Sequence, residues 1–127
     1  MNQKERMQNG LPYKAWLDGL EEEREACKQL IYEFNFLPPN QRARIPEMLQ
    51  KLLGKTGGNV WIEPPFHCDY GWNIEVGSNF FANYNLTILD VGKVTIGKNA
   101  QIAPNVAIYT AGHPIHPESR NSGYEYG

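Results

Sequence analysis

Apolar side chains recur at helical spacing through the first 57 residues of the chain. The strongest pattern covers residues 20–34, where apolar positions three or four apart form one stripe. That stripe consists of Ala26, Cys27, Leu30, Ile31 and Phe34. A short polar helix is predicted for residues 2–8 and a third helix for residues 45–53, where Pro46 fits the first turn. The sequence therefore predicts a helical segment over residues 1–57.

From Val60 onward the helical spacing gives way to apolar residues that are six positions apart. Nine such anchors fall into three runs separated by irregular skips. The runs are Ile62, Cys68 and Ile74, then Val76, Ala82 and Ile88, then Ile96, Ile102 and Ile108. A second small or apolar residue follows most anchors after four positions, as at Phe80 and Ala100. A short internal period of this kind dictates the architecture.

The period of six has a direct structural meaning. Three flat faces of six residues make one triangular coil, in which the anchors point inward and stack on their equivalents in the next coil. Gly77, Gly97, Asn79 and Asn99 suit the tight turns between faces, including turns with positive φ. Successive parallel coils pair through backbone hydrogen bonds. The pattern predicts a mainly β fold, a left-handed parallel β-helix over residues 58–127 with an N-terminal α-helical cap over residues 1–57. The alternative is an antiparallel β domain with chance spacing.

Composition narrows the classes of function. The chain has 127 residues, which is the size of one domain, and its net charge of -2 gives no electrostatic footprint for nucleic acid. No apolar run approaches the ~18 residues that a membrane span needs. The first ten residues are polar and lack the apolar stretch of a signal peptide, so the cytoplasm is the expected location. Cys27 and Cys68 are expected to be free thiols.

Several motifs resemble those of the maltose and galactoside O-acetyltransferases, in the order and spacing of that family. The matching stretches are IYEFN (31–35), IEPPFHCDYGWNI (62–74), FFANYNLTILDV (80–91), VTIGKNAQIAPNVAIYTAGHPIH (94–116) and RNSGYEYG (120–127). The resemblance runs from about residue 3 to the end of the sequence. It implies transfer of an acetyl group from acetyl-CoA to a hydroxyl of a sugar such as maltose, glucose or a galactoside.

The resemblance carries two further expectations. Family members are homotrimers, with active sites between neighbouring prisms. They also continue beyond the position of Gly127 with more hexapeptide coils, which carry much of the acyl-CoA site and one donor for the thioester oxyanion. The resemblance therefore implies a β-helix that lacks its C-terminal coils in this sequence.

His113 is the candidate general base. A sugar hydroxyl is a poor nucleophile until its proton is removed, and histidine has a suitable ordinary pKa of about 6.5. His113 follows the last hexapeptide strand in Thr110-Ala111-Gly112-His113-Pro114, where the repeat breaks into a loop. Its alternative is a surface histidine in a turn, whereas GHPIH resembles the base position of the family. Glu125 resembles a glutamate of maltose-type members and would orient the imidazole.

Four other residues are candidates for the acceptor site by resemblance, and each has a simpler structural alternative. Asn83, in FANY, is expected to contact the acceptor or the transition state. Asp69, in CDYG, and Arg24, on the long predicted helix, are expected to bind the sugar through directional hydrogen bonds. Asp90 is expected either to contact the substrate or to shape the turn at the irregular skip. Family members often carry an aspartate just after the Tyr of the N-terminal segment, and here Asp18 is the nearest substitute.

Two other classes of function stay open at this stage. Trimeric carbonic anhydrases also use left-handed β-helices and bind zinc through three histidines. This chain has three, His67, His113 and His116, but the second spacing is narrower than in that pattern and no metal is expected. The other class is a non-catalytic trimeric protein that binds sugar without acetyl-CoA. Neither cysteine has a partner arrangement for covalent catalysis, so direct attack on the thioester is expected.

Overall fold

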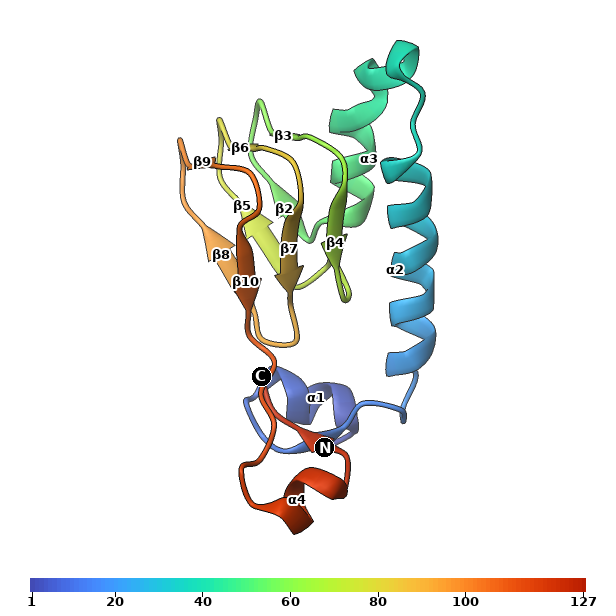
Figure 1. Cartoon of the computed structure of the whole chain (residues 1–127), viewed down its shortest axis with the longest axis vertical. Coiled ribbons are helices and arrows are strands. Elements are labelled where there is room, and N and C mark those ends of the chain that lie inside the picture. The colour runs from blue at the N-terminus through green and yellow to red at the C-terminus, as the bar shows by residue number, and fades with distance from the viewer.

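The computed structural model describes residues 1–127 and begins with the three predicted helices (Figure 1). They are α1 (Gln3–Gln8), α2 (Leu20–Asn35) and α3 (Ile45–Leu52), which confirms the helical interpretation of this segment. The α1 helix begins with a capping box, in which Asn2 Oδ1 accepts from the Glu5 N–H at 2.8 Å and Glu5 Oε2 accepts from the Asn2 N–H at 3.1 Å.

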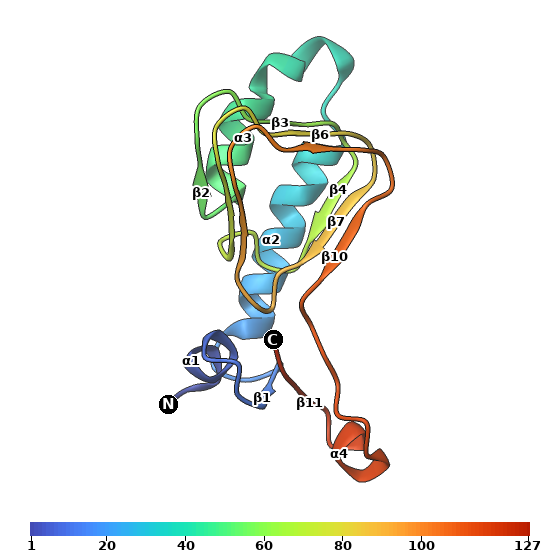
Figure 2. The same ribbon diagram turned by 90° about the vertical axis from the view of Figure 1, so that its left-hand side faces the viewer.

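Nine short strands after the helices build a triangular prism, which Figure 2 shows end-on. They are β2 (Lys55–Thr56), β3 (Trp61–Ile62), β4 (Phe66–Cys68), β5 (Ile74–Val76), β6 (Phe81–Ala82), β7 (Leu86–Leu89), β8 (Val94–Ile96), β9 (Gln101–Ile102) and β10 (Ala107–Tyr109). They form three parallel sheets, β2-β5-β8, β3-β6-β9 and β4-β7-β10. The prediction of a left-handed parallel β-helix with a helical cap is confirmed.

The predicted anchors stack on one another inside this prism. Ile62 pairs with Ala82, and Ala82 with Ile102; Cys68, Ile88 and Ile108 form a second row in the same way. Ile74 and Val76 belong to one strand, β5, which explains the irregular skip between the first two runs. The first strand of the prism, β2, begins at Lys55.

Asparagines and glycines have different tasks at the corners. Asn59, Asn79 and Asn99 have positive φ values of 60°, 59° and 64°. Their side chains form a ladder in which each Nδ2 donates to the next Oδ1 at 3.0 Å. Gly77 is required for close approach instead, because a Cβ there would lie 2.8 Å from the backbone nitrogen of Lys98.

The helical cap covers the end of the prism that is formed by β2, β3 and β4 (Figure 1). Cys27 and Phe34 on α2 are buried in the same core as Phe66 on β4, and the Phe34 and Phe66 rings meet edge-on with centroids 6.5 Å apart. Asn35, at the end of α2, pairs with both backbone groups of Phe66, at 2.9 Å and 2.8 Å. Cys27 and Cys68 are free and buried, with their sulfur atoms 3.5 Å apart.

Short elements absent from the predictions bring the two ends of the chain together (Figure 2). A two-stranded antiparallel ladder joins β1 (Tyr13–Lys14) to β11 (Tyr124–Glu125), and α4 (Pro117–Asn121) lies in the loop before β11. A 3-10 helix, η1 (Pro39–Arg44), connects α2 to α3. Two-residue strands leave no hydrophobic period that a sequence pattern could reveal.

None of the helices combines the length and apolarity required to cross a membrane.

Candidate active site

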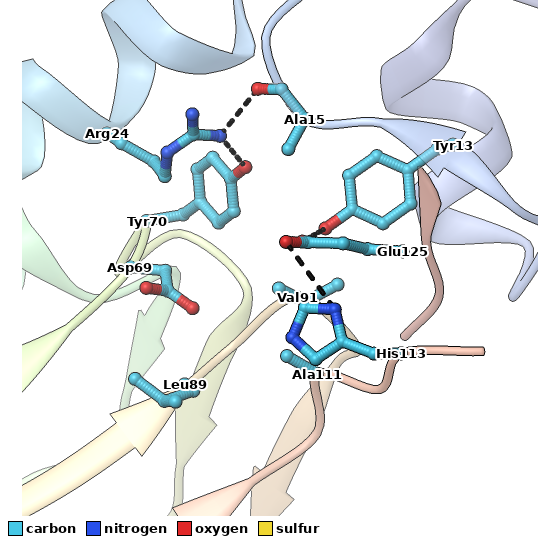
Figure 3. A pocket seen from close by; sticks show the side chains of 10 residues that line it. All are labelled: Tyr13, Ala15, Arg24, Asp69, Tyr70, Leu89, Val91, Ala111, His113 and Glu125. Atoms are coloured by element: carbon cyan, nitrogen blue, oxygen red, sulfur yellow. Dashed lines mark hydrogen bonds and ion pairs between the residues drawn. The ribbon is translucent and has the colours of Figure 1, made fainter. Parts of the chain in front are cut away.

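A cavity of about 290 Å³ lies where the β1–β11 ladder, the start of α2, the loop after β4 and the loop after β10 meet (Figure 3). Its lining residues are Tyr13, Ala15, Arg24, Asp69, Tyr70, Leu89, Val91, Ala111, His113 and Glu125. The cavity thus collects four residues that the sequence analysis singled out from separate segments: His113, Glu125, Arg24 and Asp69. Val91 and Tyr13 at its base belong to a small buried cluster beneath α1.

His113 and Glu125 face each other on one side of the cavity. Glu125 Oε1 lies 4.0 Å from His113 Nδ1, which is within ion-pair range of a protonated imidazole but too long for a hydrogen bond. The other ring nitrogen of His113, Nε2, is turned away from Glu125 toward the side where Asp69 lies (Figure 3). The His113 side chain is 41% exposed, so a ligand can reach it. This arrangement suits a histidine base that is oriented by a carboxylate.

Tyr13 holds the opposite edge of the Glu125 carboxylate. The Tyr13 hydroxyl donates to Glu125 Oε2 at 3.0 Å, and the two residues are directly paired in the β1–β11 ladder. Burial and the nearby carboxylate raise the pKa of the Tyr13 phenol, so the phenol keeps its proton and stays a donor at neutral pH. Tyr13 was not among the predicted site residues, and only its position in the ladder reveals its contact with Glu125.

Arg24 and Tyr70 form the other side of the cavity. Arg24 Nη1 donates to the Ala15 carbonyl at 2.8 Å and to the Tyr70 hydroxyl at 2.9 Å. The guanidinium carbon also lies 5.9 Å from the centre of the Tyr70 ring. These contacts fix Arg24 at the N-terminal end of α2 and leave a cationic, aromatic wall opposite His113.

Asp69 adds a carboxylate to this wall. Burial, together with the charge of Asp90, raises the pKa of Asp69 to about 6, and the Arg24 guanidinium partly opposes this shift. No hydrogen bond to a protein group occupies its carboxylate, which Figure 3 shows pointing toward the cavity. It is therefore free to bind hydroxyl groups of a ligand.

Asp90 lies beneath the cavity instead of lining it. It is completely buried, and its two carboxylate oxygens accept the backbone N–H groups of Asp69, Tyr70 and Gly71 at 2.8–3.0 Å. The Asn73 side chain donates to its carbonyl at 2.8 Å. Asp90 has no surface with which to contact a substrate, so we assign it to shaping the loop that carries Asp69. This corresponds to the turn-shaping alternative from the sequence.

Two other candidates lie away from the cavity of this chain. Asn83 follows β6 and does not line the cavity; its side-chain oxygen accepts the Tyr84 N–H at 2.8 Å. Asp18 accepts the backbone N–H of Gln3 at 2.8 Å, while Ala15 occupies the wall of the cavity. The N-terminal segment therefore contributes no carboxylate to the cavity.

The three histidines do not gather at one place. His67 is exposed on β4, His113 lines the cavity, and His116 precedes α4. No group of three or more His, Cys, Asp or Glu side chains is arranged to hold a metal ion.

The raised pKa of Asp69 predicts a pH-dependent stability. The folded chain binds this proton more tightly than the unfolded chain, where the pKa is near the ordinary 3.8. The resulting stabilisation is fully present below pH ~4 and is lost as the pH rises through about 6. We expect the gain in stability of Asp69→Asn over wild type, measured by urea denaturation, to be larger at pH 7.5 than at pH 5. A gain that is equal at both pH values would contradict this origin.

Comparison with known proteins places this chain in a family. The maltose acetyltransferase hexapeptide capping motif matches residues 6–57. The crystal structure of a maltose O-acetyltransferase from Clostridium difficile 630 superimposes with a TM-score of 0.98 at 47% identity, over 100% of this chain and 68% of that one. The chain belongs to the maltose and galactoside O-acetyltransferase family. The family resemblance predicted from the sequence is therefore confirmed.

Other members of this family agree with the assignment. The galactoside O-acetyltransferase of Escherichia coli (strain K12) is 43% identical over 122 residues, which cover 96% of this chain and 60% of that protein. Nodulation protein L of Rhizobium meliloti (strain 1021) is 40% identical over 98% of this chain and 68% of its own length. A galactoside acetyltransferase in complex with coenzyme A superimposes with a TM-score of 0.95 at 42% identity, over 100% of this chain and 64% of that one. The chain spans 53% to 68% of the length of four such curated relatives.

Proposed function

We propose that this chain forms the acceptor site and the general base of an acetyl-CoA-dependent sugar O-acetyltransferase. The observation that carries the proposal is the single cavity in which His113, backed by Glu125, faces the acceptor-type groups Asp69 and Arg24. Family membership supports acetyl-CoA as the donor, because one related structure contains coenzyme A and another contains acetyl coenzyme A.

The reaction needs one base and no covalent intermediate on the protein. His113 Nε2 takes the proton of an acceptor hydroxyl while that oxygen attacks the thioester carbonyl carbon. The C–O bond forms, the C–S bond breaks, and the imidazolium returns its proton to the departing coenzyme A thiolate. Glu125 stabilises the imidazolium between these two steps. Both cysteines are buried away from the cavity, which supports direct transfer over an acyl-cysteine route.

The wall opposite His113 supplies the chemistry that a sugar requires. The Asp69 carboxylate accepts hydrogen bonds from sugar hydroxyls, and the Arg24 guanidinium donates to their oxygens. The Tyr70 ring, held by Arg24, gives a flat apolar edge for the C–H groups of a pyranose. Maltose, glucose and galactosides all present this combination of groups.

Asn83 fits this scheme only through assembly. It lies outside the cavity of its own chain, on the outer surface after β6. In a homotrimer with sites between neighbouring prisms, Asn83 of one copy would approach the His113 cavity of the next. The exposed aromatic side chains Phe81, Tyr84 and Tyr109 on the outer faces of the prism support such packing.

Calorimetry combined with a thiol assay tests this function. We expect acetyl-CoA to bind the 127-residue chain and coenzyme A thiol to appear when glucose or maltose is added. Release of the coenzyme A thiol should require added sugar. Release without sugar would indicate hydrolysis of acetyl-CoA instead of transfer to an acceptor. Sugar binding without any binding of acetyl-CoA would mean that this chain forms at most the acceptor half of a transferase, and would favour a non-catalytic sugar-binding protein. If the chain binds neither the sugar nor acetyl-CoA, the proposal is wrong.

A further inference from the structure

Tyr13 stands out among the residues around the cavity because its one polar atom is committed to Glu125. Its side chain is completely buried in the small cluster with Met7, Leu20 and Val91. Its hydroxyl reaches across the ladder to Glu125 Oε2 at 3.0 Å, over a sequence separation of 112 residues. Packing in that cluster therefore fixes where the phenol proton points.

The two oxygens of Glu125 have separate partners. Oε2 accepts from Tyr13, and Oε1 lies 4.0 Å from His113 Nδ1. No other protein group donates a side-chain hydrogen bond to this carboxylate, so the phenol alone fixes its rotation. Figure 3 shows the three side chains in this order, with Glu125 between the Tyr13 ring and the imidazole. A free glutamate with three rotatable bonds would sample many other positions.

We propose that Tyr13 is a positioning residue that acts on His113 through Glu125. This inference rests on the proposed role of His113 as the general base. The phenol holds Oε2, which leaves Oε1 aimed at Nδ1. The carboxylate in turn favours the imidazole tautomer with the proton on Nδ1, and Nε2 keeps its lone pair for the acceptor hydroxyl. Tyr13 thereby controls the protonation geometry of a base that lies 100 residues later in the chain.

The tautomer of His113 distinguishes a positioning role of Tyr13 from a merely structural one, because a merely structural role would leave the tautomer unchanged. In ¹⁵N NMR spectra of the imidazole nitrogens, recorded above the titration range, wild type is expected to show mainly the Nδ1–H form. Tyr13→Phe keeps the buried ring and removes only the hydroxyl, so the fold is retained. We expect this variant to shift the population toward the Nε2–H form. Loss of one resonance set in His113→Ala assigns the signal among the three histidines.

Single and double variants test whether Tyr13 affects the His113 tautomer through Glu125. Glu125→Gln should shift the tautomer as well, and adding Tyr13→Phe to it should change nothing more, because the phenol then has no carboxylate to hold. Tyr32→Phe removes the same hydroxyl from an exposed site on α2 and should leave the spectrum unchanged. A tautomer shift in Glu125→Gln that is absent in Tyr13→Phe would overturn the proposal.

Kinetics separate this inference from the proposed function. In the active protein, Tyr13→Phe is expected to lower kcat on the order of tenfold, as for loss of one charge-assisted hydrogen bond, with little change in KM for acetyl-CoA. An active Tyr13→Phe variant with unchanged kcat would overturn the positioning role while leaving the transferase intact. Coupled tautomer shifts in a chain without acetyl transfer would support the positioning role and reject the transferase.

Discussion

Replacing His113 with alanine is expected to lower kcat for acetyl transfer to a sugar by about a hundredfold or more. The reason is that a neutral hydroxyl attacks a thioester slowly unless its proton leaves in the same step. His113 is the only histidine that lines the cavity. Coenzyme A release, followed with a thiol reagent at saturating sugar and acetyl-CoA, measures the loss.

His116→Ala provides the matched control for this substitution. His116 lies three residues further along the same loop and is exposed, outside the cavity. Its removal should leave kcat within about twofold of wild type, as for most surface substitutions. If His113→Ala kept more than about a tenth of the wild-type kcat, the base would have to be another group, because general-base catalysis accounts for at least a hundredfold.

The second large effect concerns stability. Asp90→Ala is expected to lower the free energy of unfolding by about 3–5 kcal/mol. The substitution removes a completely buried carboxylate that accepts three backbone N–H groups, and two of the residues that donate them, Tyr70 and Gly71, are held in a buried turn. Those donors would stay buried without partners. Urea denaturation at pH 7, with the slope of the transition fitted for each variant, measures the change.

Asp69→Ala is the control for Asp90→Ala, since it removes a carboxylate from the same loop. The Asp69 carboxylate accepts no hydrogen bond from the protein, and burial raises its pKa to about 6. Its loss should therefore cost less than about 1 kcal/mol, or should stabilise the chain at neutral pH. A loss of under about 1 kcal/mol for Asp90→Ala would contradict the view that the loop after β4 is built on this carboxylate.

The repeat made the prism predictable because each anchor has the same task in every coil. One row of the interior consists of Ile62, Ala82 and Ile102. The period in the sequence therefore corresponds directly to the stacking of successive coils. The helices α2 and α3 were predictable for a similar reason, since their apolar stripes face one core. The skip between Ile74 and Val76 was harder to interpret, because two anchors of the pattern belong to a single strand.

The site was predictable only in part. His113, Glu125, Arg24 and Asp69 were found through family motifs, and the structure gathers them around one cavity. Tyr13 was not among the predicted site residues, because its contact with Glu125 depends on a ladder that joins residues near the two ends of the chain. A tyrosine in a polar N-terminal segment looks the same whether it is exposed or completely buried. The contact with Glu125 exists only once the C-terminal loop has folded back.

The two sides of the cavity have different proposed roles. The proposed proton-transfer side is formed by residues near the two ends of the chain, Tyr13, His113 and Glu125. The proposed recognition side is formed by Arg24 in the cap and Asp69 in the first coil. Changes on the recognition side should therefore alter the choice of acceptor with less effect on the chemistry of transfer, which is the behaviour expected of a family with several acceptors.

Detection of the product tests the central claim most directly. The chain is incubated with acetyl-CoA that carries a ¹³C-labelled acetyl group and with glucose or maltose, and the sugar is analysed by NMR and mass spectrometry. We predict a labelled O-acetyl sugar, formed in equal amount to free coenzyme A in wild type and absent in His113→Ala. Coenzyme A release with labelled acetate as the only product, or equal amounts of acetyl sugar from wild type and His113→Ala, would contradict it.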